Sequence, residues 1–215
     1  MPTVSQIITF ADRKYPNQET DANKIIDLDG IHKAVYVKIA RLKNQNEIDG
    51  GTTTTANQLT YPLPSNCTID NIIAIKVSQT TTITSSTEWD TFEYAGLNDD
   101  ISSGNWYGRA TDSVFALVKD GLPITTAGLS IRIFYYKTPN ALSAVTDTPE
   151  LDSDYHDLLK FGLIQTLASQ GHNPDTEIAD FYQAKYDKFI EDVESSLSDR
   201  DNKAPSQSSQ VIEYW

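Results

Sequence analysis

The chain has 215 residues, with 30 acidic and 17 basic side chains, one cysteine and a net charge of -13 at pH 7. This length is sufficient to bury a hydrophobic core, as one large domain or two small ones. Hydrophobic residues make up 39% of the chain, which argues against wholesale disorder, and the single cysteine excludes an internal disulfide framework. The acidic balance argues against a dedicated nucleic-acid-binding protein. We also find no apolar run that predicts a membrane span, and the first residues lack the pattern of a signal peptide.

The negative charge is concentrated in one part of the chain. Residues 147–201 contain 14 acidic and 4 basic side chains, a net charge of -10. Residues 1–46 contain 7 basic and 5 acidic side chains and are slightly positive. Acidity is therefore a property of the C-terminal region and is not spread over the whole molecule.

Two amphipathic helices are predicted in the N-terminal region. The first begins after Thr3, which has the spacing of a capping box with Gln6, and it ends before Pro16. The second begins at Thr20-Asp21. Its apolar residues recur every three or four positions, as on a helix with one buried face: Ile25, Leu28, Ile31, Val35, Ile39 and Leu42.

Residues 47–146 have the pattern of an antiparallel β module with long loops. Gly50-Gly51 and the threonines that follow favour turns and extended backbone. Three runs alternate with the two-residue period of a strand, over residues 73–77, 114–118 and 129–135. Turn-rich spacers are predicted between the runs, over residues 80–87, 97–108 and 120–128.

Residues 148–197 predict a helical hairpin. Pro149 and Glu150 suit the first turn of its first helix, and Gly171 suits the position just after that helix ends. A second helix is predicted to begin at Asn173-Pro174 and to continue to Leu197. The connection between them is too short for any arrangement except a hairpin.

These elements predict an α+β protein. The helices of residues 1–46 and 147–201 form a helical bundle domain, residues 47–146 form an inserted antiparallel β domain, and residues 202–215 form an extended C-terminal tail. The tail begins with a linker rich in Ser and Gln, and four of its last five residues are large and apolar or aromatic. This segment either packs back on its own domain or docks on another subunit as a strand or anchor.

No motif for catalysis, cofactor binding or metal binding stands out. The chain has no Walker loop, dinucleotide fingerprint or HExxH motif. Asp152 and His156 would share one helix face, but no further ligand lies at a suitable spacing. Asn98-Asp99-Asp100 lacks the ligand pattern of a calcium-binding loop, and Cys67 has no electropositive neighbour to activate its thiol. We therefore predict a protein that is not an enzyme, with no catalytic residue, cofactor or metal.

Aromatic side chains gather in a region that we expect to consist of loops. Such residues usually close over a small core, although a carbohydrate-binding or partner-binding surface is the other interpretation. The aromatic residues of this region are Trp89, Phe92, Tyr94, Trp106 and Tyr107.

Three helical passages carry a resemblance to a known family: TVSQIITFADRKYPN with TDANKIIDLDGIHKAVYVKIA near the N-terminus, TPELDSDYHDLLKFGLIQTLASQGH from Thr148, and NPDTEIADFYQAKYDKFIEDVESSL from Asn173. The order and lengths of these helices resemble the head-to-tail adaptor (connector, or head-completion) proteins of tailed bacteriophages. The large β insertion is similar to the podovirus-type tubular adaptor.

This resemblance implies a structural virion protein in the phage neck that is assembled in the host cytoplasm. It implies a homo-oligomeric ring, dodecameric, that lies under the portal protein, attaches tail or nozzle proteins and lets DNA pass, with no cofactor and no membrane. The C-terminal tail would then bind the portal or a neighbouring subunit through Val211, Ile212, Tyr214 and Trp215.

The β domain would supply the surface that faces the tail of the virion. The candidates for that surface are Trp89, Phe92, Trp106 and Tyr107. The alternative function is a glycan- or receptor-binding virion module that uses the same aromatic residues.

Overall fold

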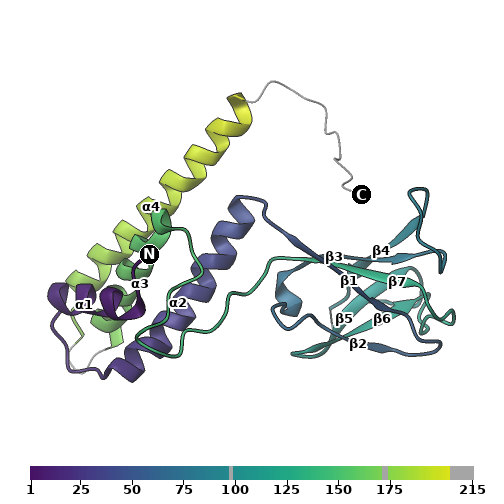
Figure 1. Ribbon diagram of the computed structural model, residues 1–215, viewed down its shortest axis with the longest axis horizontal. Coiled ribbons are helices and arrows are strands. Elements are labelled where there is room, and N and C mark those ends of the chain that lie inside the picture. The colour runs from purple at the N-terminus through teal and green to yellow at the C-terminus, as the bar shows by residue number, and fades with distance from the viewer. Residues whose placement is uncertain (97–98, 171–173, 204–215) are drawn as a thin grey trace. The chain divides into compact units, whose positions relative to one another are not determined.

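Figure 1 shows the computed structural model of the chain, which describes residues 1–96, 99–170 and 174–203. The chain divides into two compact units, residues 1–43 with 141–215 and residues 44–140, compared with predicted boundaries at 46/47 and 146/147. The first unit is helical, and the second contains a β-sheet inserted between the N-terminal and C-terminal helices. The predicted α+β class is therefore confirmed.

In the helical unit, one helix is central. Helix α3 packs against each of the other three helices, whereas α1 and α2 contact each other little. The apolar faces of the four helices enclose one core, because burial removes these side chains from water. The elements are α1 (Val4–Lys14), α2 (Asp21–Leu42), η2 (a 3-10 turn, Ser153–Tyr155), α3 (His156–Gln170) and α4 (Thr176–Lys203).

The first two helices begin where the sequence predicts. The backbone N–H of Thr3 donates to Gln6 Oε1 at 3.0 Å at the start of α1. The backbone N–H of Asn23 donates to Thr20 Oγ1 at 3.3 Å at the start of α2. Each contact satisfies a backbone group that has no partner within its helix.

The prediction that a helix begins near Pro149 is wrong, because α3 begins at His156. The segment around Asp147, which precedes α3, instead supplies a hydrogen-bond acceptor for the first turn of α1. The backbone N–H of Val4, in the first turn of α1, donates to the carbonyl oxygen of Asp147 at 2.9 Å. The carboxylate of Asp147 in turn accepts from the backbone N–H of Ser143 at 2.7 Å, which fixes a turn. The backbone around Asp147 is held in this turn, where it completes the first turn of α1, and so it does not start a helix itself.

Helix α4 begins with a side-chain cap at Asp175, whose Oδ1 accepts from the backbone N–H of Ile178 at 3.1 Å. The helix continues to Lys203, farther than predicted. The predicted helix end at Gly171 and start at Asn173 lie outside the described residues.

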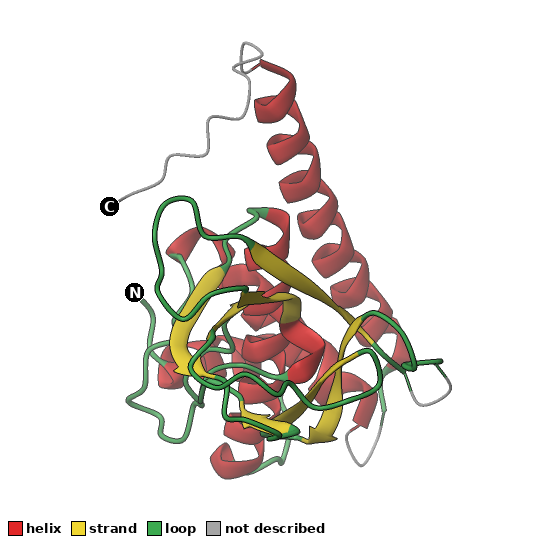
Figure 2. Cartoon of the chain, turned by 90° about the vertical axis from the view of Figure 1, so that its right-hand side faces the viewer, coloured by secondary structure: helices red, strands yellow, loops and turns green. Residues whose placement is uncertain are grey.

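The second unit is built on a curled, mixed sheet of seven strands (Figure 2). The strand order across the sheet is β1-β7-β3-β4-β5-β6-β2, so β1 and β2 are its edges. Its buried face includes Phe92, Phe115, Ile131 and Ile133. The strands are β1 (Glu47–Thr53), β2 (Thr60–Pro62), β3 (Ile72–Ser78), β4 (Trp89–Tyr94), β5 (Asn105–Thr111), β6 (Val114–Lys119) and β7 (Ser130–Tyr135), with a 3-10 turn η1 (Ile69–Asn71) before β3.

The sheet differs from the prediction at β4 and β5. These two strands pair in parallel, with Glu93 opposite Trp106, whereas the other adjacent strands pair in an antiparallel manner. Neither strand was predicted, and β5 begins inside the predicted spacer 97–108. In β4 the large residues Trp89, Phe92 and Tyr94 are spaced three and then two residues apart, so the strand has no regular alternation of apolar and polar residues.

Candidate interaction surfaces

The structure separates Asp152 and His156, the pair with metal-ligand spacing. His156 is 2% exposed, and its Nε2 lies 2.7 Å from the carbonyl oxygen of Leu151. Asp152 instead forms an ion pair with Lys43, whose Nζ lies 2.9 Å from Asp152 Oδ2. Among the described residues, no group of three or more His, Cys, Asp or Glu side chains could hold a metal ion. No helix in the same ranges has the length and hydropathy needed to cross a membrane.

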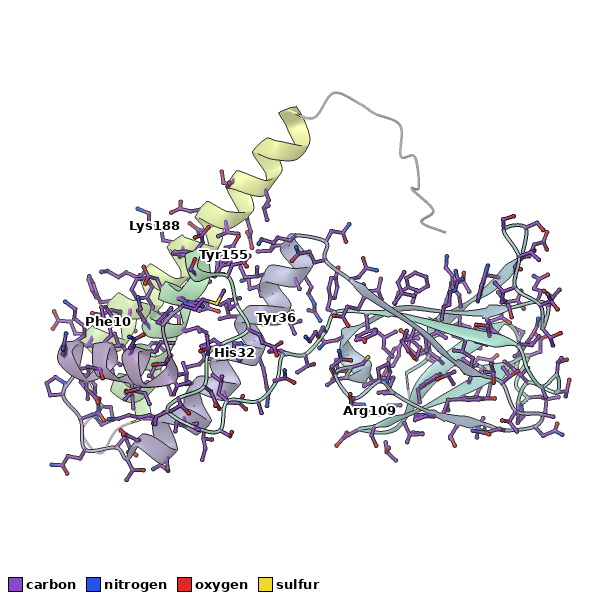
Figure 3. The ribbon with its side chains drawn as sticks, viewed as in Figure 1. Phe10, His32, Tyr36, Arg109, Tyr155 and Lys188 are labelled. Atoms are coloured by element: carbon purple, nitrogen blue, oxygen red, sulfur yellow. The ribbon has the colours of Figure 1, made fainter. Side chains whose placement is uncertain are left out.

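A buried histidine that the sequence patterns did not single out lies in the core of the helical unit. His32 projects from α2, as does Tyr36, and the two rings meet edge to face with centroids 6.3 Å apart (Figure 3). His32 is 0% exposed, and neither ring nitrogen has a hydrogen-bond partner within the described residues. Burial therefore lowers the pKa of His32 below its ordinary value of 6.5, although Asp29 and Glu150 oppose this effect.

The environment of the sole cysteine does not favour a reactive thiol. Cys67 is buried in the core of the sheet unit. Burial, with a smaller contribution from Asp49, raises the pKa of the Cys67 thiol to about 12. The thiolate, which is the nucleophile, is therefore scarce at neutral pH.

The aromatic residues between 89 and 107 lie on strands, so the expectation that they occupy loops is wrong. Phe92 is 2% exposed and Tyr107 is 5% exposed, and both belong to the core of the sheet. These two side chains are thus not available to the tail-facing or glycan-binding surface for which they were candidates. Trp89 and Trp106 are half-buried.

The two tryptophans already have partners within the sheet unit. The guanidinium of Arg132 lies 4.2 Å from the centroid of the Trp89 ring and covers one of its faces. The Nε1–H of Trp106 donates to the carbonyl oxygen of Ser103 at 2.6 Å. Sugar-binding sites use exposed ring faces and free polar groups, so these contacts do not favour the glycan-binding alternative.

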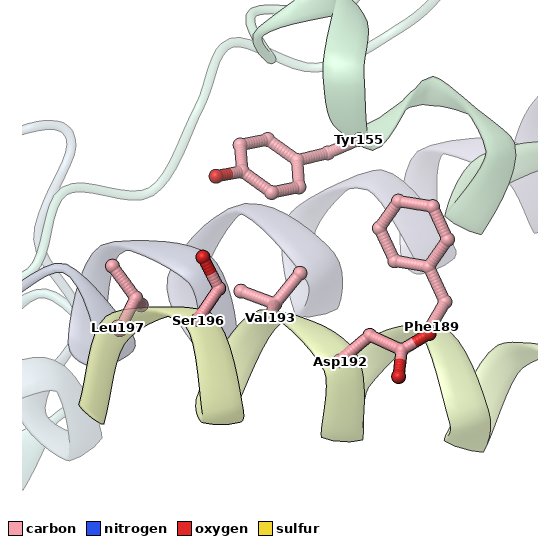
Figure 4. Close-up of a pocket in the computed structure, with 6 residues that line it drawn as sticks. All are labelled: Tyr155, Phe189, Asp192, Val193, Ser196 and Leu197. Atoms are coloured by element: carbon pink, nitrogen blue, oxygen red, sulfur yellow. The ribbon is translucent and has the colours of Figure 1, made fainter. Parts of the chain in front are cut away.

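The candidate partner-binding residues of the tail, Val211, Ile212, Tyr214 and Trp215, lie outside the described residues. The described part of the chain shows instead a surface that the sequence did not reveal. It is a groove between η2 and the C-terminal half of α4, of about 210 Å³ (Figure 4). We call it the α4 groove, and its lining residues are Tyr155, Phe189, Asp192, Val193, Ser196 and Leu197.

The α4 groove exists because α4 is longer than the helix beside it. Helix α3 has 15 residues and α4 has 28, so the second half of α4 extends past the start of α3. There Tyr155 faces α4, with its ring centroid 6.5 Å from that of Phe189. Lys43 Nζ lies 4.7 Å from the centroid of the Tyr155 ring. The signal in the sequence was the apolar stripe of α4, whose last members are Phe189, Val193 and Leu197 and which has no matching stretch in the shorter α3.

A second surface of α4 is acidic. Five exposed carboxylates recur along α4 at intervals of three, four or seven residues, so they follow one face of the helix. This face lies beside the apolar stripe and does not overlap it. The acidic residues are Glu177, Asp180, Asp187, Glu191 and Glu194.

Sequence comparison identifies the family. The chain matches the SU10 adaptor protein family over residues 2–210, which includes the helices at both ends and the inserted sheet. The chain belongs to this family. It is a family of phage head–tail adaptors, so the resemblance seen in the helical passages is confirmed for nearly the whole chain. The SU10 adaptor protein family is structural, which is consistent with a protein that is not an enzyme. No curated protein shows a significant match to the chain.

Proposed function

We propose that this adaptor forms a ring under the portal, connects the capsid to the tail and lets DNA pass. The match to the SU10 adaptor protein family over residues 2–210 carries the proposal. In this proposal the ring is dodecameric and lies in the neck of the virion after assembly in the host cytoplasm. Its partners are the portal protein and the tail or nozzle proteins, and the role requires no cofactor.

The C-terminal segment supplies the contact with the portal or with a neighbouring subunit. Val211, Ile212, Tyr214 and Trp215 follow a hydrophilic linker, and fully burying one large apolar side chain contributes roughly 1.5–3 kcal/mol. A ring repeats each contact in every subunit, so a weak single contact becomes strong in the assembly.

The acidic face of α4 supports the passage of DNA. Carboxylates that line a channel repel the phosphate backbone, so DNA slides and does not bind. In this proposal the five carboxylates of the acidic face point toward the channel of the ring.

Deletion of residues 204–215 tests the contact with the portal. The shortened chain keeps every described residue, so we expect an unchanged circular dichroism spectrum and loss of binding to purified portal rings. A full-length variant with serine at positions 211, 212, 214 and 215 is the matched control, because it removes the apolar groups and keeps the length. Unchanged portal binding in both variants would refute the role of the tail.

Native mass spectrometry of the adaptor mixed with portal rings tests the ring itself. We expect one adaptor ring of fixed stoichiometry on each portal ring. Variable numbers of bound adaptor subunits would contradict a closed ring.

Charge reversal tests the channel. In the assembled ring, Asp187→Lys with Glu191→Lys should increase the retention of DNA. The control is Glu88→Lys with Glu93→Lys, which makes the same change in charge on exposed residues of the sheet unit. This control should not increase the retention of DNA. Equal retention by the two double variants would place the acidic face of α4 outside the channel.

A further inference from the structure

The α4 groove is a largely apolar surface, with Asp192 and Ser196 as its polar lining residues, and the described part of the chain offers no segment that covers it. Its floor consists of Phe189, Val193 and Leu197 from α4, and Tyr155 forms one wall. Phe189, Val193 and Leu197 are only half-buried. Apolar or aromatic side chains bind such a groove most favourably, because they remove its apolar surface from water.

A segment of suitable chemistry follows α4 in the same chain. Residues 211–215 have the sequence VIEYW, in which four of the five side chains are large and apolar or aromatic. We propose that, in the unassembled protein, residues 211–215 occupy the α4 groove of their own chain.

The linker is long enough for this return. Residues 204–210 can span up to roughly 23–25 Å when fully extended. Along α4, Leu197 lies roughly 9 Å and Phe189 roughly 21 Å from Lys203, at the helical rise of 1.5 Å per residue. The segment can therefore turn back at the end of α4 and reach both ends of the groove.

The same geometry favours the chain's own segment over that of a second copy. A short flexible linker gives its attached segment an effective concentration in the millimolar range. A segment from another molecule is present only at the protein concentration, which is far lower in a dilute solution. Docking in the free protomer is therefore intramolecular.

This inference deepens the proposed function, because the same residues are proposed to bind the portal or a neighbouring subunit. While the groove holds residues 211–215, these apolar side chains are covered in the free protein. The portal or neighbouring subunit then has to displace them from the groove. The contact thus restrains assembly until the proper partner is present.

Fluorine NMR on the full chain labelled with fluorotryptophan tests the inference without the portal. The signal of Trp215 is assigned by its loss in Trp215→Phe. We expect it to be shifted from the position found in a free VIEYW peptide, and Val193→Glu should move it to the peptide position. Ser195→Glu adds the same charge on the exposed side of α4 and should leave the signal in place.

Two results would contradict the inference. A Trp215 signal at the peptide position in the unaltered protein would show that the groove is empty. A signal that moves toward the peptide position on dilution would show that a second copy supplies the segment. If Val193→Glu unfolds the protein, Leu197→Glu provides the same readout nearer the end of the helix. Because no portal is present, failure here leaves the portal-binding experiment to be decided separately.

Discussion

The ammonium group of Lys24 lies 2.7 Å from Asp12 Oδ1, in an ion pair that joins α2 to α1. Lys24 is only 3% exposed, whereas 38% of the Asp12 side chain is accessible. Asp12 Oδ1 also accepts from Asn17 Nδ2 at 2.9 Å, in the connection between the two helices. One carboxylate thus compensates a buried charge and fixes the connection between α1 and α2.

We expect Asp12→Ala to lower the free energy of unfolding by about 1–3 kcal/mol, because it leaves a buried ammonium without its partner. The added change Lys24→Met should recover most of this loss, since it removes the uncompensated charge. Urea unfolding of the two single variants and the double variant measures the coupling. Additive losses in the double variant would show that the two charges do not stabilise each other.

Gly162 allows close packing between α3 and α2. A Cβ atom at this position would lie 2.9 Å from Cγ2 of Ile31, too near for a branched side chain that is itself packed. We expect Gly162→Ala to destabilise the protein by about 1–2 kcal/mol despite the better helix propensity of alanine. The control is Gly30→Ala in α2, where an added Cβ would meet no described heavy atom within 4 Å beyond its chain neighbours and its own helix backbone, and a gain of up to about 1 kcal/mol is expected. Thermal unfolding distinguishes the two, and a stabilised Gly162→Ala variant would contradict the close approach.

Buried His32 makes stability dependent on pH. Its pKa is lowered in the folded state by burial, so the unfolded chain binds the proton more readily. The stabilising effect is complete above the unfolded pKa of 6.5 and is lost as pH falls through the lower pKa of the folded state. The loss is about 1.4 kcal/mol for each unit by which folding lowers the pKa.

The charged and titratable groups that act on His32 are Asp29, Glu150, His156 and Lys33. In His32→Leu these groups remain, and only the His32 contribution to the pH dependence disappears. Urea unfolding from about pH 7 to about pH 5 should therefore show a smaller loss of stability than in the unaltered protein. Parallel curves for the two proteins would exclude His32 as the cause.

Cys67 should resist alkylation while the protein is folded. The thiol is buried, and its pKa of about 12 leaves almost no thiolate at neutral pH. We expect iodoacetamide to modify Cys67 only at the rate at which the sheet unit opens, and rapidly in urea. Mass spectrometry of the intact protein measures this, and fast labelling in native buffer would show that the thiol is accessible.

Local patterns were sufficient for much of the fold. The capping residues Thr3 and Thr20 and the apolar stripe of α2 predicted the first two helices, because these signals act within a few residues of the chain. The regular alternation in residues 129–135 predicted β7 for the same reason. The helical order and lengths were also sufficient to suggest the adaptor family, which the match over residues 2–210 establishes.

Other features depended on contacts between distant residues. Pro149 suits a helix start, yet the neighbouring backbone at Asp147 completes the first turn of α1. Phe92 and Tyr107 belong to an aromatic cluster that also suits a surface, but pairing between β3, β4, β5 and β6 buries them.

The sequence by itself thus determined the α+β class, the acidity of the C-terminal helices and the absence of a disulfide framework, because these depend on composition and short-range periodicity. Only the tertiary structure decided which polar groups are buried, as His32 is, and where an apolar stripe has no neighbour among the described residues, as in the α4 groove. Burial is set by which distant segments pack together, and no local pattern in the chain specifies that.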